Sequence, residues 1–407
     1  MIQPRDYQAD AIARSVRFLK QGAPGGGLVV LPTGAGKSVV IAGVVQALDA
    51  PCLIFQPTKE ILEQNANKLL SYGYEPKVYS ASLGLKEVGA ITLATIGSVK
   101  DNPGLFDHVP YVIVDEAHLV NAKAGMYKTF LEALGGVRLL GLTATPFRLH
   151  TDGYGGSQLK FLTRTRPRVF GAVVAYAQIR DLIEAGYLVR PEYHSVSGFA
   201  TADLKVNTTG ADYTDESIKR YFNRIGFNDR VRRVVERLLA VGRKNALVFT
   251  RFVEDAERLA HDVPGTAVVS ADTKPKVREA TLAAFRAGEI KVVANVGVLG
   301  IGFDYPALET VVLARPTISL GLYYQQVGRL LRPHPAKTSA WVVDMVDQMG
   351  QFGKIEDLWL QPAGTSSYGA LWEMATIPAG GVPKILTNKY FGDGKFTRRR
   401  TPAAPRW

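Results

Sequence analysis

Short apolar segments alternate with longer amphipathic segments along most of this 407-residue chain, and this alternation limits the folds that are open to it. Strands rich in Val, Ile and Leu that are separated by helical segments predict parallel sheets covered by crossover helices. The pattern occurs twice. The expected strands lie at residues 28–31, 52–55, 91–94, 111–114 and 139–142, and then at residues 246–249, 266–269, 291–294, 310–313 and 341–343. Two series of similar length predict two similar α/β domains rather than one large sheet.

The pattern loosens between the two series and again after the second. We therefore expect a first domain over residues 1–190, a linker or insertion over 191–227, a second domain over 228–350 and a small appendage over 351–407. The appendage ends in a basic tail, because residues 384–407 hold seven Lys or Arg and one Asp, half of the chain's net charge of +12. This excess favours a polyanionic partner, although an arginine-rich proteome would give the same composition.

Composition and cysteine content exclude several classes of protein. The hydrophobic fraction of 46% and the charged fraction of 21% are ordinary for a globular chain. The chain has no run of about 18 apolar residues, so no membrane span is predicted. The first residues lack the features of a signal peptide, and a cytoplasmic location is therefore expected. The single cysteine, Cys52, excludes an internal disulfide and a cysteine-cluster zinc site. Its apolar neighbours predict that it packs as a small hydrophobic residue.

A glycine-rich loop follows the first expected strand. Residues 31–38 (LPTGAGKS) connect this strand to an apolar helix expected at residues 39–48. In such loops backbone N–H groups turn toward phosphates at a helix N-terminus, a lysine reaches the β- and γ-phosphates, and a serine hydroxyl binds Mg²⁺. The strict pattern has glycine where this chain has Leu31. The sequence nevertheless predicts an ATP and Mg²⁺ site formed by Thr33, Gly34, Ala35, Gly36, Lys37 and Ser38.

Two adjacent carboxylates, Asp115 and Glu116, follow the expected strand at residues 111–114. Parallel α/β sheets bind ligands at the carboxyl ends of their strands, so both carboxylates are expected to face the phosphate loop. Asp115 is predicted to hold Mg²⁺, and Glu116 to orient and deprotonate the attacking water. An isolated Asp-Glu pair is more often the solvated start of a helix, but the buried strand and the upstream loop favour the catalytic interpretation.

The second domain has no phosphate loop of its own, because its first strand leads into residues 250–254 (TRFVE), which contain no glycine. One ATP per chain is therefore expected. This domain carries Arg329 and Arg332, whose spacing places both on one side of a helix. We expect them to stabilise the charge that develops on the γ-phosphate, an effect worth roughly 10³–10⁵ in rate in related enzymes. The alternative is a structural ion pair with a neighbouring carboxylate.

Together these segments resemble the motifs of superfamily 2 helicases that carry the DEAH form of motif II. The resemblance extends over residues 1–350 and implies two tandem RecA-like domains with ATP bound between them. It also implies that the ATP cleft contains Gln8, His118, Gly302, Asp304 and Gln325. The first of these would bind the adenine base. Motif III, at residues 143–145 (TAT), would couple hydrolysis to movement.

The same resemblance implies an ATP-driven enzyme that moves along or unwinds nucleic acid. Motifs Ia and Ib touch the nucleic-acid backbone in this family, which is a sequence-independent and salt-sensitive mode of binding. The residues expected to make such contacts are Thr58, Lys59, Thr95 and Ser98 in the first domain and Arg251 in the second. Residues 31–38, 141–148 and 324–329 are most similar to bacterial and phage RadD-like DNA-repair helicases. The zinc-binding C-terminal part of that group has no counterpart here, because the necessary cysteines are absent.

Single-stranded, forked or branched DNA is therefore the expected partner of a monomeric protein that does not bind membranes. Two alternatives stay open, an RNA helicase and an ATP-gated clamp that binds and releases DNA without separating its strands. The clamp would hydrolyse ATP on DNA but would fail to displace a strand. Hydrolysis stimulated by RNA alone would indicate the RNA enzyme.

Overall fold

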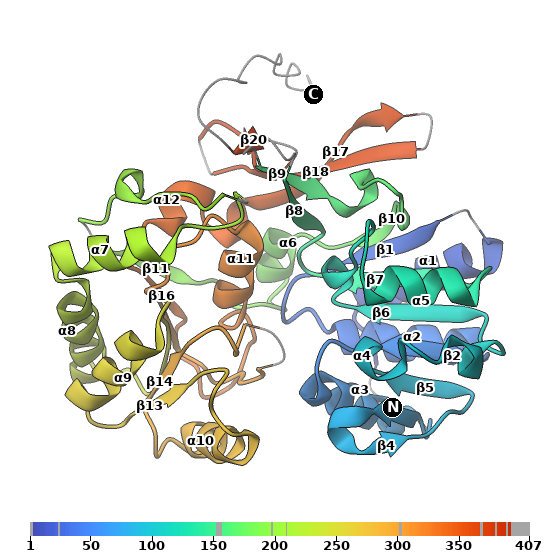
Figure 1. Cartoon of the computed structure of the whole chain (residues 1–407), viewed down its shortest axis with the longest axis horizontal. Helices are drawn as coiled ribbons and strands as arrows, with labels where there is room; N and C mark the ends of the chain where they lie inside the picture. The colour runs from blue at the N-terminus through green and yellow to red at the C-terminus, as the bar shows by residue number, and fades with distance from the viewer. Residues whose placement is uncertain are drawn as a thin grey trace.

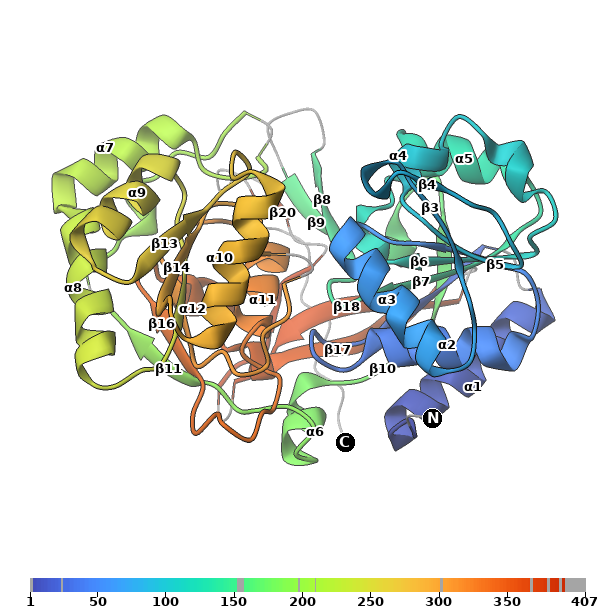
Figure 2. The same ribbon diagram turned by 90° about the horizontal axis from the view of Figure 1, so that it is seen from below.

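Two α/β lobes lie side by side in the computed structural model, and a third group of strands lies above them in the view of Figure 1. Turned by 90°, the structure shows the strands β17 and β18 running from the second lobe across to the first (Figure 2). The structure describes residues 3–22, 25–151, 157–196, 198–208, 210–300, 303–366, 369–378, 381–387 and 390–391.

The first lobe is built on a sheet whose strands are parallel, apart from an antiparallel pair at one edge. Its central strands are buried on both faces, which explains why their sequences are continuous in apolar residues. In spatial order the described strands are β10 (Phe170–Tyr176), β1 (Gly26–Val30), β7 (Arg138–Thr143), β6 (Tyr111–Asp115), β2 (Cys52–Phe55), β5 (Ile91–Ala94), β3 (Lys77–Ser80) and β4 (Leu85–Lys86). The helices of this lobe are α1 (Asp6–Gln21), α2 (Lys37–Leu48), α3 (Lys59–Ser71), α4 (Ile96–Val99) and α5 (Met126–Leu134).

The second lobe repeats this arrangement around a sheet in which every described pairing is parallel. In spatial order its strands are β11 (Glu192–Ser195), β16 (Trp341–Asp344), β15 (Thr310–Leu313), β12 (Ala246–Phe249), β14 (Val292–Asn295) and β13 (Thr266–Val269). Its helices are α7 (Asp215–Ile225), α8 (Phe227–Ala240), α9 (Val253–Asp262), α10 (Pro275–Ala287), α11 (Leu320–Gly328) and α12 (Gln348–Phe352).

The two-lobed α/β architecture predicted from the sequence is confirmed. All ten expected strands are present, each within two residues of its expected bounds. Four strands of the two sheets were not expected, namely β3 and β4 in the first sheet and the edge strands β10 and β11. β10 pairs with β1 in the first sheet, and β11 pairs with β16 in the second. Because β11 belongs to the second sheet, this part of the segment expected as a linker lies within the second lobe.

A C-terminal strap crosses from the second lobe to the first. We use this name for the antiparallel strands β17 (Leu358–Ser366), β18 (Gly369–Thr376) and β19 (Lys384–Ile385). The strap follows α12 of the second lobe and packs on β10 of the first, and the turn before the strap, Ile355–Asp357, packs on α6 (Ile179–Glu184) of the first lobe. A smaller sheet beside it contains β8 (Phe147–Thr151), β9 (Ser157–Phe161) and β20 (Tyr390–Phe391).

Hydrogen bonds fix the strap to the first lobe. The side chain of Gln178 pairs with the backbone of Leu360 in both directions, at 2.7 Å to its carbonyl oxygen and 3.1 Å from its N–H. Arg180 donates to Asp357 at 2.9 Å and to the carbonyl oxygen of Ile377 at 2.8 Å. Since Gln178 is buried, these bonds are shielded from competing water. The expected basic tail lies outside the described residues from position 392 onward.

Two further expectations concern single features of the fold. Cys52 is fully buried in β2, and burial raises the pKa of its thiol to about 12, so it packs as the inert hydrophobic residue that was predicted. Among the described residues, no helix is both long and apolar enough to cross a membrane.

Candidate nucleotide site between the two lobes

The glycine-rich loop adopts the conformation that a phosphate site needs. Gly34 and Gly36 have φ angles of +87° and +79°, in the left-handed region that only glycine enters without strain. The helix α2 begins directly afterwards at Lys37. The N–H groups of Val39 and Val40 donate to the Gly36 carbonyl oxygen, whereas those of Lys37 and Ser38 precede the first helical hydrogen bond. These donors and the positive end of the helix dipole favour an anion at this position.

Tyr7 and Gln8 fix the conformation of this loop through hydrogen bonds. The Gln8 amide donates to the carbonyl oxygen of Ala35 at 2.8 Å, and the Tyr7 hydroxyl donates to the same oxygen at 2.7 Å. A side chain at Gly36 would collide with the Gln8 amide, so this position requires glycine. The predicted contact between Gln8 and adenine stays a prediction, and Tyr7 is a supporting residue that the sequence analysis missed.

The strand order brings the predicted carboxylates to the loop. Within the first sheet β7 lies between β1 and β6, so the loop after β1 and the carboxylates after β6 share one edge. Glu116 lies 3.1 Å from the Lys37 ammonium. The Glu116 backbone has a φ of +53°, a strained value for a residue other than glycine and one that is common at functional sites.

The two carboxyl groups differ in their tendency to ionise. Burial opposes ionisation of Glu116, but the charge of Lys37 and a hydrogen bond from His118 hold its pKa well below the usual range. Burial and the neighbouring Glu116 charge raise the pKa of Asp115 to about 6. Asp115 therefore lacks sufficient compensating positive charge, whereas Glu116 has it.

A buried amide that the sequence analysis missed, Asn65, fixes the Asp115 carboxylate, and a second, Gln56, holds Asn65 in place. The Asn65 amide donates to Asp115 at 3.2 Å and to the side-chain oxygen of Gln56 at 2.8 Å. A polar residue on the buried face of α3, between Leu62 and Leu69, was the signal that could have identified Asn65. These contacts leave the carboxylate oriented before any ligand arrives.

The residues at this edge fit a magnesium ion. Mg²⁺ prefers oxygen ligands and is usually held by one or two carboxylates or hydroxyls together with phosphate oxygens and water. Asp115 supplies a buried carboxylate that lacks a full counter-charge, and Ser38 supplies a hydroxyl in the first turn of α2. Among the described residues no group of three or more His, Cys, Asp and Glu side chains is placed to hold a metal.

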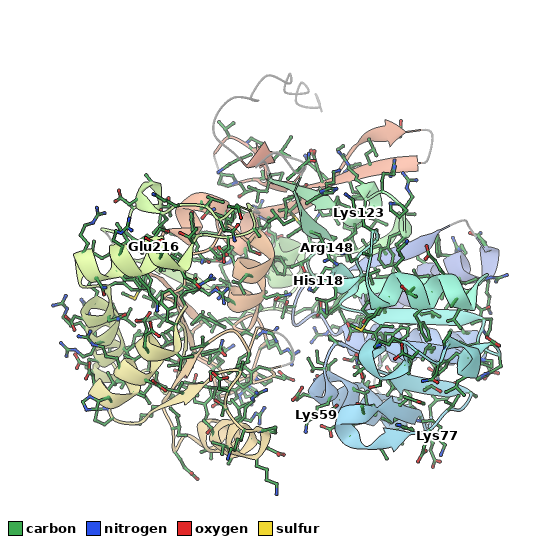
Figure 3. All side chains as sticks on the ribbon, viewed as in Figure 1. Lys59, Lys77, His118, Lys123, Arg148 and Glu216 are labelled. Carbon is green, nitrogen blue, oxygen red and sulfur yellow. The ribbon has the colours of Figure 1, made fainter. Side chains whose placement is uncertain are left out.

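His118 connects three motifs across the cleft. Its Nδ1 lies 3.0 Å from the Thr143 hydroxyl and 3.2 Å from the Glu116 carboxylate. Its Nε2 lies 3.3 Å from the side-chain amide of Gln325 in the second lobe. An amide N–H can donate only to an unprotonated nitrogen, so this arrangement favours the tautomer with hydrogen on Nδ1. His118 lies on the side of the first lobe that faces the second (Figure 3).

The expectation that both arginines lie on one helix is wrong. The helix α11 ends at Gly328, and Arg329 and Arg332 follow on a turn. The physical reason is Pro333, because the residue before a proline is disfavoured in helical conformation. The two arginines consequently point to different partners.

Arg332 faces the phosphate loop and Arg329 supports the second lobe. A Cβ placed on Gly34 would lie 3.1 Å from the Arg332 side chain, and Arg332 forms an ion pair with Asp304. Arg329 donates to the carbonyl oxygens of Phe303, at 2.8 Å, and Gly300. Burial and the nearby charge of Arg332 lower the pKa of Arg329 to about 10, so it is still a cation at neutral pH. Gly302 lies outside the described residues.

The turn that carries Arg332 is fixed by residues that were not predicted. The Lys337 ammonium donates to the carbonyl oxygens of Leu330, at 2.7 Å, and Arg332, at 2.8 Å. Burial lowers the pKa of Lys337 to about 8. The Gln64 amide of the first lobe also donates to Asp304 at 3.3 Å, which adds a second contact across the cleft. The cleft is therefore closed onto the phosphate loop.

The residues expected to touch nucleic acid gather at the same edge of the first lobe. Thr58 caps the N-terminus of α3 by accepting from the Ile61 N–H at 3.4 Å, and Lys59 follows it. The hydroxyls of Thr95 and Ser98 lie 2.7 Å apart. A cavity of about 540 Å³ opens beside Thr95, and Lys59 lies on the side facing the second lobe (Figure 3). Their role in binding stays a prediction.

Comparison with known proteins agrees with this two-lobed site. A family model described as "Type III restriction enzyme, res subunit" matches residues 1–148, and one described as "Helicase conserved C-terminal domain" matches residues 229–334. The first match contains the phosphate loop and the carboxylates, and the second contains Arg329 and Arg332. The two lobes therefore correspond to the two RecA-like domains that these helicase family models describe.

Several curated proteins are similar over most of the chain. A "51.5 kDa protein" of a Lactococcus phage is 28% identical over 78% of this chain and 65% of its own length. The "Putative ATP-dependent helicase IRC3" of Saccharomyces cerevisiae is 25% identical over 84% of this chain and 51% of its own. The "DNA 3'-5' translocase XPB2" of Sulfurisphaera tokodaii is 24% identical over 81% of this chain and 79% of its own. The chain thus spans between half and two thirds of the first two relatives.

Solved structures share the fold at low sequence identity. A fragment of a putative HsdR subunit of a type I restriction enzyme from Vibrio vulnificus matches with a TM-score of 0.63 and 21% identity, over 86% of this chain and 65% of its own. Dbp5 of S. cerevisiae, bound to RNA and ADP BeF3, matches with a TM-score of 0.57 and 16% identity, over 85% of this chain and 84% of its own. These matches show the shared fold of the two lobes.

Proposed function

We propose that the protein is a DNA-dependent ATPase that couples ATP hydrolysis to movement along DNA or to its unwinding. The observation that carries this proposal is the contact of the second lobe with the phosphate loop, where Arg332 lies against Gly34 and Gln325 lies 3.3 Å from His118. A second lobe that senses the nucleotide can change its distance from the first during each turnover.

The residues of the site have distinct roles in this proposal. Lys37 binds the β- and γ-phosphates, and Glu116 accepts a proton from the attacking water. Arg332 stabilises the charge on the transferred phosphoryl group, while Arg329 positions the turn. Ser38 and Asp115 would hold Mg²⁺, which neutralises charge on the phosphates when bound.

Several observations support DNA as the polymer. The names of the yeast and archaeal relatives specify an ATP-dependent helicase and a DNA translocase, and the second name specifies 3′–5′ movement. We propose the same substrate and direction for this chain. The similarity of residues 31–38, 141–148 and 324–329 to RadD-like enzymes favours a role in DNA repair, with forked or single-stranded DNA as the substrate and a monomer as the active form.

The proposal is tested by steady-state ATP hydrolysis with no polymer, single-stranded DNA, duplex DNA, forked DNA and RNA, each at low and moderate salt. We expect the largest stimulation with single-stranded or forked DNA, and a decrease in apparent DNA affinity as salt rises. Stimulation by RNA alone would replace DNA with RNA as the substrate. Hydrolysis that ignores every polymer would contradict the coupling between the lobes.

Strand displacement separates a helicase from a clamp. A duplex with a single-stranded tail at its 3′ or its 5′ end distinguishes the two directions of movement. Displacement that requires the 3′ tail would support the proposed direction. DNA-stimulated hydrolysis without displacement of either substrate would indicate an ATP-gated clamp.

A further inference from the structure

A short hairpin before α7 reaches into the loops of the second lobe. Its two sides are joined by a bridge between Val206 and Tyr213 and by a hydrogen bond from the Asn207 N–H to the Asp212 carbonyl oxygen at 2.8 Å. Leu204 and Tyr213 are buried, so the hairpin is anchored to the lobe. This anchoring places the side chain of Asp212 at a fixed position among its neighbours.

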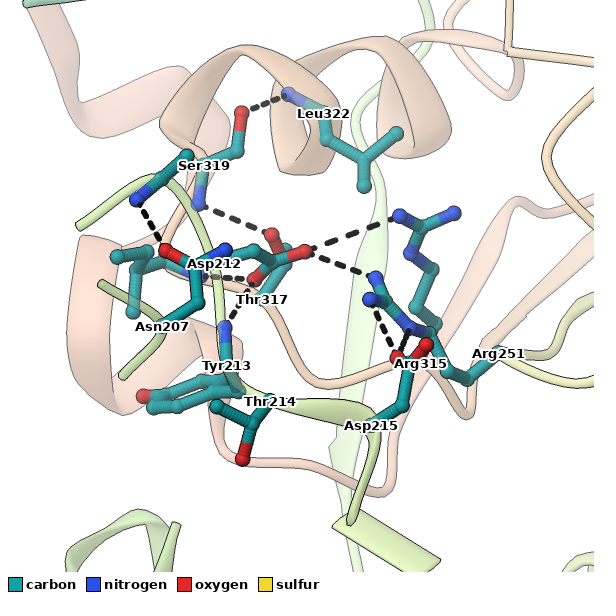
Figure 4. Close-up of polar contacts among 12 residues, drawn as sticks. Asn207, Asp212, Tyr213, Thr214, Asp215, Arg251, Arg315, Thr317, Ser319 and Leu322 are labelled. Carbon is teal, nitrogen blue, oxygen red and sulfur yellow. Dashed lines mark hydrogen bonds and ion pairs between the residues drawn. The ribbon is translucent and has the colours of Figure 1, made fainter. Parts of the chain in front are cut away.

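Asp212 faces two arginines, Arg251 and Arg315 (Figure 4). Its Oδ2 is 2.9 Å from Arg251 and 3.8 Å from Arg315. A second carboxylate, Asp215, also contacts Arg251, at 2.6 Å, but its side chain is 62% exposed, compared with 16% for Asp212. Asp212 is therefore the partly buried carboxylate that both arginines share.

The two arginines come from adjacent strands. Arg251 follows β12 and Arg315 follows β15, and these strands pair in parallel, so both side chains stand at the carboxyl edge of the second sheet. Two guanidinium groups this close repel each other unless an anion lies between them. Burial lowers the pKa of Arg315, and the charge of Arg251 lowers it further. The pair thus requires a negatively charged partner.

Asp212 and Asp215 satisfy this pair incompletely. The Nε of Arg315 is buried without a hydrogen-bond partner among the described residues. A phosphate group offers more acceptor oxygens than the single Asp212 oxygen that now serves both arginines, and guanidinium groups bind phosphate through two donors at once. The site lies at the start of α11, and the turn of Arg332 follows the other end of that helix.

We infer that Arg251 and Arg315 form a site for one backbone phosphate of DNA, and that Asp212 occupies this site when no strand is bound. The inference rests on the proposed function, and it places a contact between the second lobe and the DNA backbone at these two arginines. It also explains why Arg251, which was expected to touch nucleic acid, is held by carboxylates in this structure.

Displacement of Asp212 would alter contacts that lead to the nucleotide cleft. The other oxygen of Asp212 accepts from the backbone N–H of Ile318 at 3.3 Å. The next residue, Ser319, caps the N-terminus of α11 by accepting from the Leu322 N–H at 3.2 Å. Since α11 carries Gln325, the phosphate site and the cleft are joined through one short loop.

The test uses Asp212→Asn in the full chain. Asparagine keeps an oxygen that can accept from Ile318 but removes the charge that competes with phosphate. We expect this variant to bind a fluorescent single-stranded oligonucleotide about threefold to tenfold more tightly than the wild type at low salt, measured by anisotropy. Unchanged affinity would overturn the inference. Weaker binding together with a lower melting temperature would also overturn it, because Asp212 would then serve to position Arg251.

A matched control excludes a general effect of net charge. Asp229→Asn also removes one carboxylate from an ion pair of the second lobe, with Arg258 at 3.0 Å, but both partners are about half exposed. We expect its DNA affinity to change by less than about twofold. An equal gain in both variants would show that only the net charge matters, and would overturn the site.

A double-mutant cycle with Arg251→Ala locates the gain. Removal of Arg251 is expected to weaken DNA binding and to abolish the gain from Asp212→Asn, since the two residues act on one phosphate. A gain that persists in the double variant would overturn the inference. If the wild-type protein bound no DNA at any salt concentration, the proposed function itself would fail. If the wild type bound DNA and every variant bound it with the same affinity, the phosphate site would be excluded and the proposed function would stand.

Discussion

The two lobes place a strand and a helix in the same order, but the turns that connect them differ. In the first lobe β1 leads through Gly34 and Gly36 into α2, and backbone N–H groups are left open toward the cleft. In the second lobe β12 leads through Thr250 and Arg251 into α9, and the arginine side chain takes part in ion pairs. A glycine turn lets the backbone hold a phosphate, whereas the other turn can contribute only a side chain. Similar lobes can therefore share one nucleotide and divide its recognition between them.

Lys37→Ala is the variant expected to disturb the first lobe most. The lysine supplies the charge that meets the β- and γ-phosphates, so steady-state ATP hydrolysis should fall by at least about 10³-fold, and binding of a fluorescent ATP analogue should weaken. Lys244→Ala, at the start of β12 in the second lobe, is the control because its side chain is 62% exposed. A normal hydrolysis rate in Lys37→Ala would contradict the assignment of residues 31–38 as the phosphate loop.

Glu116→Gln should separate nucleotide binding from hydrolysis within the first lobe. The amide keeps the shape of the side chain but cannot accept the proton of the attacking water, so the hydrolysis rate should fall by roughly 10²–10⁴-fold. ATP binding should persist, which equilibrium binding of the labelled nucleotide will measure. Glu132→Gln on the exposed side of α5 should have no effect. Hydrolysis at the normal rate would place the general base at another residue.

Arg332→Lys measures what the second lobe adds to the site of the first. Lysine keeps the positive charge but loses the planar guanidinium, so we expect hydrolysis to fall by about 10²-fold while nucleotide affinity changes little. Arg258→Lys on α9 is a suitable comparison, because its side chain is 54% exposed. If Arg332→Lys were fully active, the second lobe would contribute no catalytic group and the division between the lobes would be wrong.

Gln325→Ala is expected to give the smallest effect. It removes one neutral contact across the cleft, to His118, and a hydrogen bond of this kind contributes about 1 kcal/mol. The ratio of DNA-stimulated to basal hydrolysis should therefore fall by about fivefold. The readout is this ratio rather than either rate alone. An unchanged ratio would mean that the lobes communicate through other contacts, such as that of Gln64 with Asp304.

Most of the fold could be predicted because the apolar pattern of each buried strand is local. The strands that carry the phosphate loop and the carboxylates were found because they are buried on both faces and lead into the glycine-rich loop and the Asp-Glu pair. In contrast, β11 has the sequence Glu-Tyr-His-Ser and no apolar pattern. It is a strand only because β16 offers it an edge to pair with, and such tertiary pairing overrides local propensity.

The candidate site was predictable where its chemistry depends on sequence order and not where it depends on distant contacts. Lys37 and Glu116 were assigned from their neighbours along the chain, and their separation of 3.1 Å agrees with the assignment. No local pattern could show that Asn65 would orient Asp115 or that Asp212 would hold Arg251. The end of α11 before Arg329 was foreseeable, because Pro333 lies close by, and the arginine spacing was given too much weight.

The strap has a mechanical consequence. The polypeptide passes between the lobes once where α6 leads into β11, and again where α12 leads into the strap that Gln178 and Arg180 fasten to the first lobe. A single crossing would leave the lobes free to swivel about any axis. Two separated crossings act as two hinge points, and they confine the opening of the lobes to rotation about the line that joins them. Under the proposed function, each hydrolysed ATP would then return the lobes along one path, with the same contacts to DNA at every step.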